Sequence, residues 1–148
     1  RVGSIVMISA PILTDEEQAE LSEVHLPIPL DEEGTRFKVM WERINAHQGA
    51  GMTLEMMARS MAENLRGGED YECGHRAAFA HSARYRTLLG ELTQHVTVLN
   101  PADDLQHHSR RAAGLLRHGE VIECPEWGHG FLDAFTADAV RAVINALR

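Results

Sequence analysis

The chain has 148 residues, 44% of them hydrophobic and 24% charged, which is the ordinary composition of one soluble globular domain. A domain of about 150 residues buries roughly 70% of the surface that its unfolded chain exposes, so this length supports a hydrophobic core without disulfides or metal ions. The net charge of −8 counts against nucleic acid and anionic membranes as partners, because both favour a basic surface.

Residues 4–10 are predicted to form the first strand. This short, nearly continuous apolar run ends at Pro11, as is typical of a strand buried on both faces of a sheet. We assign residues 1–11 to the core sheet. The strand begins almost directly after Arg1, a start without methionine, so we expect further residues upstream.

Residues 12–93 contain helix patterns without a convincing strand, and they are predicted to form a helical insertion. The stretch 15–34 is acidic and contains two prolines, and we interpret it as an irregular connection. Apolar residues spaced three, four and seven positions apart then predict a helix over residues 37–44. A second helix follows Thr53, the expected N-cap, and a third helical region covers residues 74–92.

Residues 94–148 are predicted to form a strand, a helix, a strand and a helix. The strands cover residues 96–99 and 121–124, each is followed by a proline, and an apolar helix pattern lies between them. Thr136 is the expected N-cap of the last helix. This order of elements builds parallel sheets. The predicted fold class is therefore α/β, with about three parallel strands, flanking helices and a helical insertion.

Polar residues follow two predicted strands at positions where packing does not require them. Asp103 and Asp104 follow strand 96–99, and His129, between two glycines, follows strand 121–124. Because the carboxyl ends of parallel strands meet at one edge of a sheet, we expect a carboxylate and the imidazole to lie together. Such a carboxylate fixes the tautomer of a histidine that takes a proton from a nucleophile. Alternatively, the aspartates only cap a helical turn and His129 is only solvent-exposed.

The segments around these residues resemble the C-terminal part of an α/β-hydrolase. They read Leu-Asn-Pro-Ala-Asp-Asp-Leu over 99–105 and Pro-Glu-Trp-Gly-His-Gly-Phe-Leu-Asp over 125–133, with a helix and a strand between them. In that family the nucleophile, the acid and the histidine follow each other along the chain. The resemblance implies that Asp104 is the acid and His129 the base, with Asp103 as the alternative acid.

The resemblance covers nearly the whole chain but only the second half of the family's fold. Residues 1–11 resemble the strand after the nucleophile's helix, and residues 12–93 resemble the helical cap of many members. No serine or cysteine has the small flanking residues of a nucleophile elbow. We therefore expect this chain to be inactive alone, with a Ser, Asp or Cys nucleophile in a missing N-terminal half, which is its main expected partner.

An ordinary member of the family would hydrolyse a carboxylic ester through an acyl intermediate. The same fold also hosts dehalogenases, epoxide hydrolases, C–C hydrolases and peptidases. The resemblance implies a small apolar or ester-type substrate, bound by cap side chains, namely Trp41, Met57, Met61, Phe79 and Tyr85. A Met-rich helical face is alternatively plain core. The rival interpretation is a non-catalytic binding or interaction domain of the same fold.

The sequence indicates no cofactor and no metal site. Adjacent His107 and His108 point about 100° apart on a helix, so they cannot hold one ion together with the aspartates before them. No nucleotide fingerprint occurs, and no apolar run reaches the about 18–20 residues of a membrane helix. Unpaired Cys73 and Cys124 fit a reducing, cytoplasmic setting. An open edge of a half sheet predicts self-association into a homo-oligomer, or pairing with the missing half.

Overall fold

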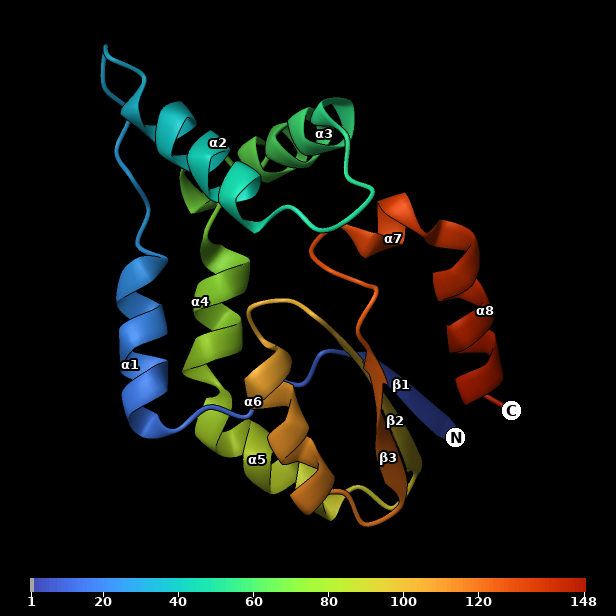
Figure 1. Cartoon of the computed structure of the whole chain (residues 1–148). Coiled ribbons are helices and arrows are strands. Elements are labelled where there is room, and N and C mark those ends of the chain that lie inside the picture. The colour runs from blue at the N-terminus through green and yellow to red at the C-terminus, as the bar shows by residue number, and fades with distance from the viewer. Residues whose placement is uncertain (1) are drawn as a thin grey trace.

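Three parallel strands form one sheet, as the sequence predicted. The structure is a computed structural model that describes residues 2–148 and their side chains, apart from those of Ser82 and Ala83. The strands lie in the order β1-β2-β3, with β2 paired to both neighbours (Figure 1). Their bounds are Ser4–Ile8 for β1, His95–Pro101 for β2 and Gly119–Cys124 for β3. The predicted α/β fold class is therefore confirmed.

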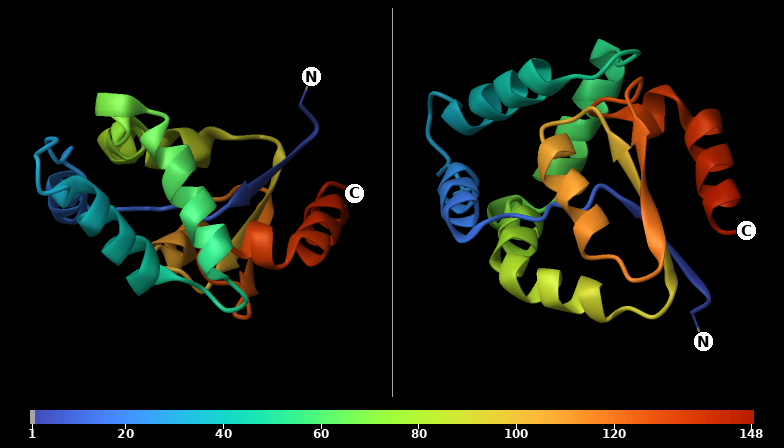
Figure 2. Two further views of the ribbon diagram at one scale, coloured as in Figure 1. Left: turned by 90° about the horizontal axis from the view of Figure 1, so that it is seen from above. Right: turned by 60° about the horizontal axis from the view of Figure 1, so that its bottom comes forward.

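The two faces of the sheet belong to two separate hydrophobic cores, because successive residues of a strand point to opposite faces. Helix α6 (Gln106–Arg110) and helix α8 (Thr136–Ala146) lie on opposite sides of the sheet (Figure 2). One core contains Ala10, Ile12, Leu89, Val96, Val98 and Ala112. The other contains Leu99, Cys124, Trp127, Phe131 and Ala139. Helices therefore cover both faces of β2, which is buried from its second residue onward.

The central strand, β2, is buried on both faces of the sheet, whereas β3 is largely exposed. In β3, Cys124 is buried but Ile122 is 38% exposed, since no further strand of the described chain pairs with its outer edge. Strand β1 is partly buried, and its last residue, Ile8, is 41% exposed. Both outer strands are therefore less buried than β2, because each pairs with a neighbour on one side only among the described residues.

Between β1 and β2 the described residues form helices joined by loops, and Gln48 in one of these loops makes an isolated parallel bridge to His129. The helices are α1 (Asp15–Val24), α2 (Thr35–His47), α3 (Leu54–Leu65), α4 (Cys73–Ala80) and α5 (Ser82–Glu91), with a short 3-10 turn at Gly68–Asp70. We call α1 to α5 the helical segment. In Figure 1, α2 and α3 lie above the upper end of the sheet. At this same end the chain leaves β3 and continues into α7. None of the helices among residues 2–148 is long and apolar enough to cross a membrane.

Helix α1 corrects the expectation of an irregular connection over residues 15–34. Thr14 begins the helix with a capping box: its hydroxyl accepts from the Glu17 amide at 3.2 Å, and the Glu17 carboxylate accepts from the Thr14 amide at 2.8 Å. Three acidic residues in the first turn also favour a helix start. The irregular connection is therefore confined to the residues after His25, where the two prolines lie.

The C-terminal helices also differ from the prediction in detail. The crossover between β2 and β3 consists of α6 and a 3-10 turn, Arg111–Gly114, rather than one longer helix. After β3 the chain forms α7 (Phe131–Ala134) before α8, and Phe135 rather than Thr136 occupies the N-cap of α8. The Thr136 hydroxyl instead donates to the Leu132 carbonyl at 2.6 Å, so it gives a hydrogen-bond partner to a carbonyl of the preceding helix, α7.

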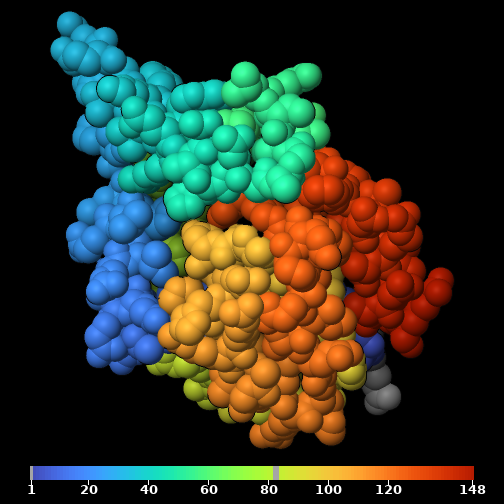
Figure 3. All heavy atoms as spheres, in the orientation of Figure 1, coloured from blue at the N-terminus to red at the C-terminus, as the bar shows by residue number. Residues whose placement is uncertain are grey.

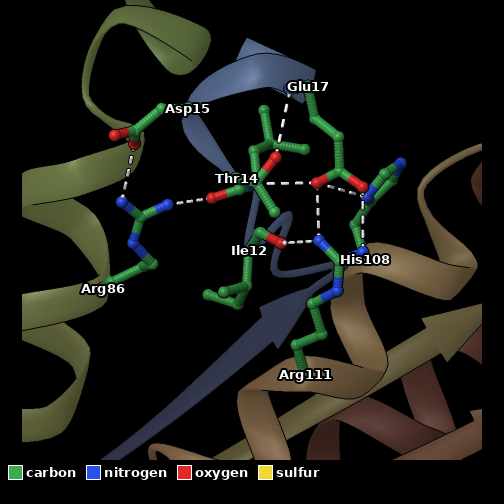
Figure 4. A network of polar contacts seen from close by, with 8 residues as sticks. Ile12, Thr14, Asp15, Glu17, Arg86, His108 and Arg111 are labelled. Atoms are coloured by element: carbon green, nitrogen blue, oxygen red, sulfur yellow. Dashed lines mark hydrogen bonds and ion pairs between the residues drawn. The ribbon is translucent and has the colours of Figure 1, made fainter.

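An ion-pair network fastens α1 to the core (Figure 4). Arg111 donates to both carboxylate oxygens of Glu17, at 2.5 and 2.8 Å, and to the Ile12 carbonyl at 2.9 Å. The hydrogen bond from Arg111 lowers the pKa of Glu17 to about 2. Arg86 of α5 contacts Asp15 at 3.0 Å from the other side. The network therefore ties the start of the helical segment to the crossover between β2 and β3.

Candidate active site

The loops after β2 and β3 meet at one edge of the sheet. Buried Asn100 fixes the first loop, because its amide nitrogen donates to Glu123 of β3 at 3.0 Å and to the Gln106 carbonyl at 3.2 Å. The Ala102 amide donates to the Trp127 carbonyl at 2.6 Å and so joins the two loops directly. The loop with the aspartates and the loop with the histidine therefore converge, as expected for consecutive parallel strands.

The two adjacent aspartates have different partners. Asp103 accepts from the Leu105 amide at 2.9 Å and from the Ser9 hydroxyl at 3.2 Å, so it caps its own turn and holds the end of β1. Asp104 points the other way, and its Oδ1 lies 2.7 Å from Nε2 of His129. Burial raises the pKa of Asp103, whereas the hydrogen bond to His129 lowers the pKa of Asp104. Only the Asp104 carboxylate contacts the imidazole.

The imidazole of His129 is a half-exposed base. Its side chain is 46% exposed and that of Asp104 is 50% exposed, so water screens the pair. The hydrogen bond from Asp104 raises the pKa of His129 above its ordinary value. Among residues 2–148, without the two undescribed side chains, no hydroxyl or thiol lies within hydrogen-bond distance of the ring. Because Asp104 engages Nε2, the nitrogen left for a further partner is Nδ1.

Three glycines let the helical segment dock onto the histidine loop. The Gly49 amide, just after α2, donates to the His129 carbonyl at 3.0 Å. A Cβ at Gly49 would lie 2.6 Å from that carbonyl oxygen and 2.8 Å from the Gly128 Cα, so both positions require glycine. Gly130 has φ +78°, a conformation that glycine adopts without strain. Gly49 and Gly128 therefore permit close backbone contact between the helical segment and the histidine loop, and Gly130 leaves room for the Met52 side chain.

His47 adds a third titratable side chain from the helical segment. It lies in the last turn of α2, and its ring is edge-on to that of His129, with centroids 5.7 Å apart. One ligand atom each from His47, Asp104 and His129 lies within 4.8 Å of the others. The sequence analysis missed His47, because this residue lies outside the predicted helix over residues 37–44 and belongs to neither of the two strand-end segments.

A cavity of about 490 Å³ lies between the helical segment and the two loops. Asp104 and His129 line it, together with apolar side chains from the helical segment, namely Met40, Ile44, Met52 and Phe79. In Figure 3 the atoms of α2 and the following loop cover the loops after β2 and β3 from above. Ligand sites are concave and mainly apolar with a few polar groups, so this cavity qualifies as one.

The structure brings one of the five expected substrate-binding residues, Phe79, to this cavity. Met57 is 0% exposed and belongs to the interior of the helical segment. The Tyr85 hydroxyl contacts the Met7 sulfur at 3.7 Å, so this side chain packs beside β1. Trp41 and Met61 are partly buried but do not line the cavity. The alternative of plain core thus describes Met57 and Tyr85 better.

Comparison with known proteins finds similarity at the level of structure. No protein-family model and no curated protein matches the chain. An esterase from Exiguobacterium antarcticum matches with TM-score 0.67 and 12% identity over 98% of this chain and 57% of the esterase. A bromoperoxidase from Bacillus anthracis has TM-score 0.67 and 10% identity, over 98% of this chain and 58% of its own. An enol-lactonase from Burkholderia xenovorans LB400 has TM-score 0.64 and 12% identity, over 99% and 56%.

These neighbours define a hydrolase-like α/β fold. The chain has part of the α/β-hydrolase fold, and it spans only about 57% of the length of the structures that it matches. The fold that the sequence resemblance implied is therefore confirmed.

Proposed function

We propose that this chain supplies the acid and the general base of an α/β-hydrolase that cleaves an ester or a related carboxylic bond. In this proposal Asp104 orients the imidazole and His129 moves the proton. The 2.7 Å contact between them at the carboxyl ends of two parallel strands is the observation that carries it. Neighbours described as an esterase and an enol-lactonase support this bond class.

The nucleophile of the proposed reaction comes from the part of the fold that this sequence does not include. A serine there would lose its hydroxyl proton to His129 as its oxygen attacks the ester carbonyl, and the leaving alcohol would take that proton. Water then gives a proton to His129 as its oxygen attacks the acyl enzyme, and His129 returns this proton to the serine oxygen as the carboxylic acid leaves. Asp104 stabilises the imidazolium in both steps, consistent with the raised pKa of His129.

The cavity suggests the kind of substrate. Its volume of about 490 Å³ lies in the range of small-molecule sites, and the methionine, isoleucine and phenylalanine side chains beside His129 offer an apolar surface. We therefore propose a small ester with an apolar acyl or alcohol group. In this view the helical segment acts as a cap that selects the substrate.

The remaining half of the fold is the proposed partner. Val140 and Ile144 of α8 and Leu147, just after it, are between 45% and 50% exposed, and Ile8 at the end of β1 is 41% exposed. Such an apolar surface is covered in a complete domain or in a complex. We propose that the other half of the α/β-hydrolase fold packs here, and that without it a second copy of the chain takes its place.

The test is turnover of a short-chain p-nitrophenyl ester by the product of the complete reading frame. His129→Ala should lower kcat by at least about 10³-fold, as loss of a catalytic base does. His107→Ala, which removes an exposed histidine outside the cavity, should leave the rate unchanged. A normal rate in His129→Ala would exclude His129 as the base, and absence of any turnover in the unaltered protein would favour the binding-domain interpretation.

A further inference from the structure

Three side chains with metal-binding groups meet at one carboxylate oxygen of the helical segment. His25 follows α1, Glu72 precedes α4, and His75 lies in the first turn of α4. The Nδ1 atoms of His25 and His75 lie 3.4 and 2.7 Å from the same atom, Oε2 of Glu72. The two imidazole rings are stacked, with centroids 4.3 Å apart. Two nitrogens and one oxygen therefore converge on one point.

Glu72 is an unusual place for a carboxylate, since its side chain is only 6% exposed. A buried carboxylate needs a positive partner or several hydrogen bonds. Its Oε1 has such a partner, because Nη1 of Arg43 lies 3.4 Å away. Among the described residues, its Oε2 has the two imidazole Nδ1 atoms as hydrogen-bond partners. A metal ion bound to this oxygen and to the two nitrogens would take the place of the ring protons in these hydrogen bonds.

The imidazoles are suited to bind such a cation. The His25 side chain is only 21% exposed, and its Nδ1 faces Glu72. A neutral imidazole is the form that ligates metals.

We propose that His25, Glu72 and His75 bind a divalent transition-metal ion, with zinc as the best match. Two imidazole nitrogens and a carboxylate form the protein ligand set of open zinc sites, in which the fourth position takes water or a ligand. With bonds of about 2.0–2.1 Å, two ligand atoms of a tetrahedral ion lie about 3.3–3.4 Å apart. The pair His25–Glu72, at 3.4 Å, already has this spacing. His75, 52% exposed, has room to move outward from 2.7 Å.

The open position of this ion would face the cavity that Asp104 and His129 also line. The site therefore offers a ligand with an anionic group, such as a carboxylate, a contact opposite the proposed base. This inference adds a metal site to the chain and does not depend on ester hydrolysis. The sequence showed no metal site, because residue 25 lies 47 positions from residue 72 and only the packing of α1 on α4 joins them.

The test is a titration of the 148-residue chain with Zn²⁺ by calorimetry and with Co²⁺ by visible absorption, where tetrahedral Co²⁺ gives an intense band. We expect one tight equivalent. Loss of a residue that only hydrogen-bonds to a metal ligand typically weakens metal binding by about 10–100-fold. His75→Ala removes a direct ligand, so it should raise the Kd by more than this. His25→Ala should behave likewise. Both variants retain Glu72 with Arg43, and circular dichroism reports whether they fold.

Two matched controls separate this site from its alternatives. His47→Ala removes a ligand of the second histidine cluster in the same cavity and should leave the tight site intact. His107→Ala tests an exposed histidine elsewhere. Loss of binding in His47→Ala but not in His75→Ala would place the ion at the second cluster and overturn the proposal. Absence of a tight equivalent, or equal affinity in all variants, would overturn it as well.

Discussion

Replacing Asp104 by asparagine tests the contact on which the proposed chemistry depends. The substitution keeps the size of the side chain and removes the charge that faces Nε2 of His129 at 2.7 Å. Because both side chains are about half exposed, the pair is worth about 0.2–1 kcal/mol, as for other exposed ion pairs. Because the Asp104 carboxylate is the main cause that raises the pKa of His129, that pKa should fall in Asp104→Asn.

The assay is an NMR titration of the His129 ring between pH 4 and pH 9 in the 148-residue chain. Asp103→Asn is the matched control, because Asp103 contacts Ser9 and Leu105 but not the imidazole. We expect the pKa of His129 to fall clearly in Asp104→Asn and by less in Asp103→Asn. A larger effect of Asp103→Asn, or an unchanged pKa in Asp104→Asn, would refute this assignment of the acid.

The same substitution should change stability in a defined range of pH. A raised pKa in folded His129 gives stability that is complete below its ordinary value of 6.5 and is lost as pH rises through the folded value. A lowered pKa in Asp104 gives stability that is complete above 3.8 and is lost as pH falls through the folded value. Asp104→Asn should therefore lower the free energy of unfolding by about 0.2–1 kcal/mol near pH 5.5, and by little near pH 9.

Three further changes probe other parts of the structure. Gly49→Ala should destabilise the fold by about 1–3 kcal/mol in urea unfolding, because the new methyl group would meet the backbone of the histidine loop. Gly74→Ala is the control and should not destabilise the fold, because no atom lies within 4 Å of the added Cβ. Equal effects of the two substitutions would contradict the contact between Gly49 and the histidine loop. Glu17→Gln should reduce the loss of stability that the unaltered chain shows as pH falls from 4.5 to about 2, since the folded pKa of Glu17 is lowered; parallel acid unfolding curves would show that the pair with Arg111 contributes nothing. Ile144→Glu should reduce self-association in sedimentation, because Ile144 is 45% exposed on α8; a monomeric unaltered chain would contradict this.

Much of the site geometry was predictable because it depends on local features of the sequence. Short apolar runs that end near prolines predicted β2 and β3, and parallel strands place their carboxyl ends together. The family resemblance favoured Asp104 over Asp103 as the acid, but the residues alone left both open, because the choice depends on which carboxylate the turn directs toward Ser9. Thr14 and Glu17 have the spacing of a capping box, which predicts a helix start. The sequence analysis gave more weight to the two prolines that follow and so predicted an irregular connection.

The lining of the cavity was the least predictable part. Helical spacing tells which side chains turn inward, but it does not tell whether they face other helices or an open space. Phe79 and Met57 illustrate the difference, since both are buried and only Phe79 reaches the cavity. His25 and His75 meet at Glu72 only because α1 packs on α4, and no local pattern encodes that contact.

The most direct measurement is ester turnover by the product of the complete reading frame with Asp104→Ala and Asp103→Ala compared side by side. The account predicts that Asp104→Ala lowers kcat by about 10³–10⁴-fold, as loss of the residue that orients a catalytic histidine does. Asp103→Ala should cost less than about tenfold, because this side chain holds only the loop and the end of β1. The reverse order, or full activity in Asp104→Ala, would contradict the assignment of Asp104 and His129 as the acid and base of this site.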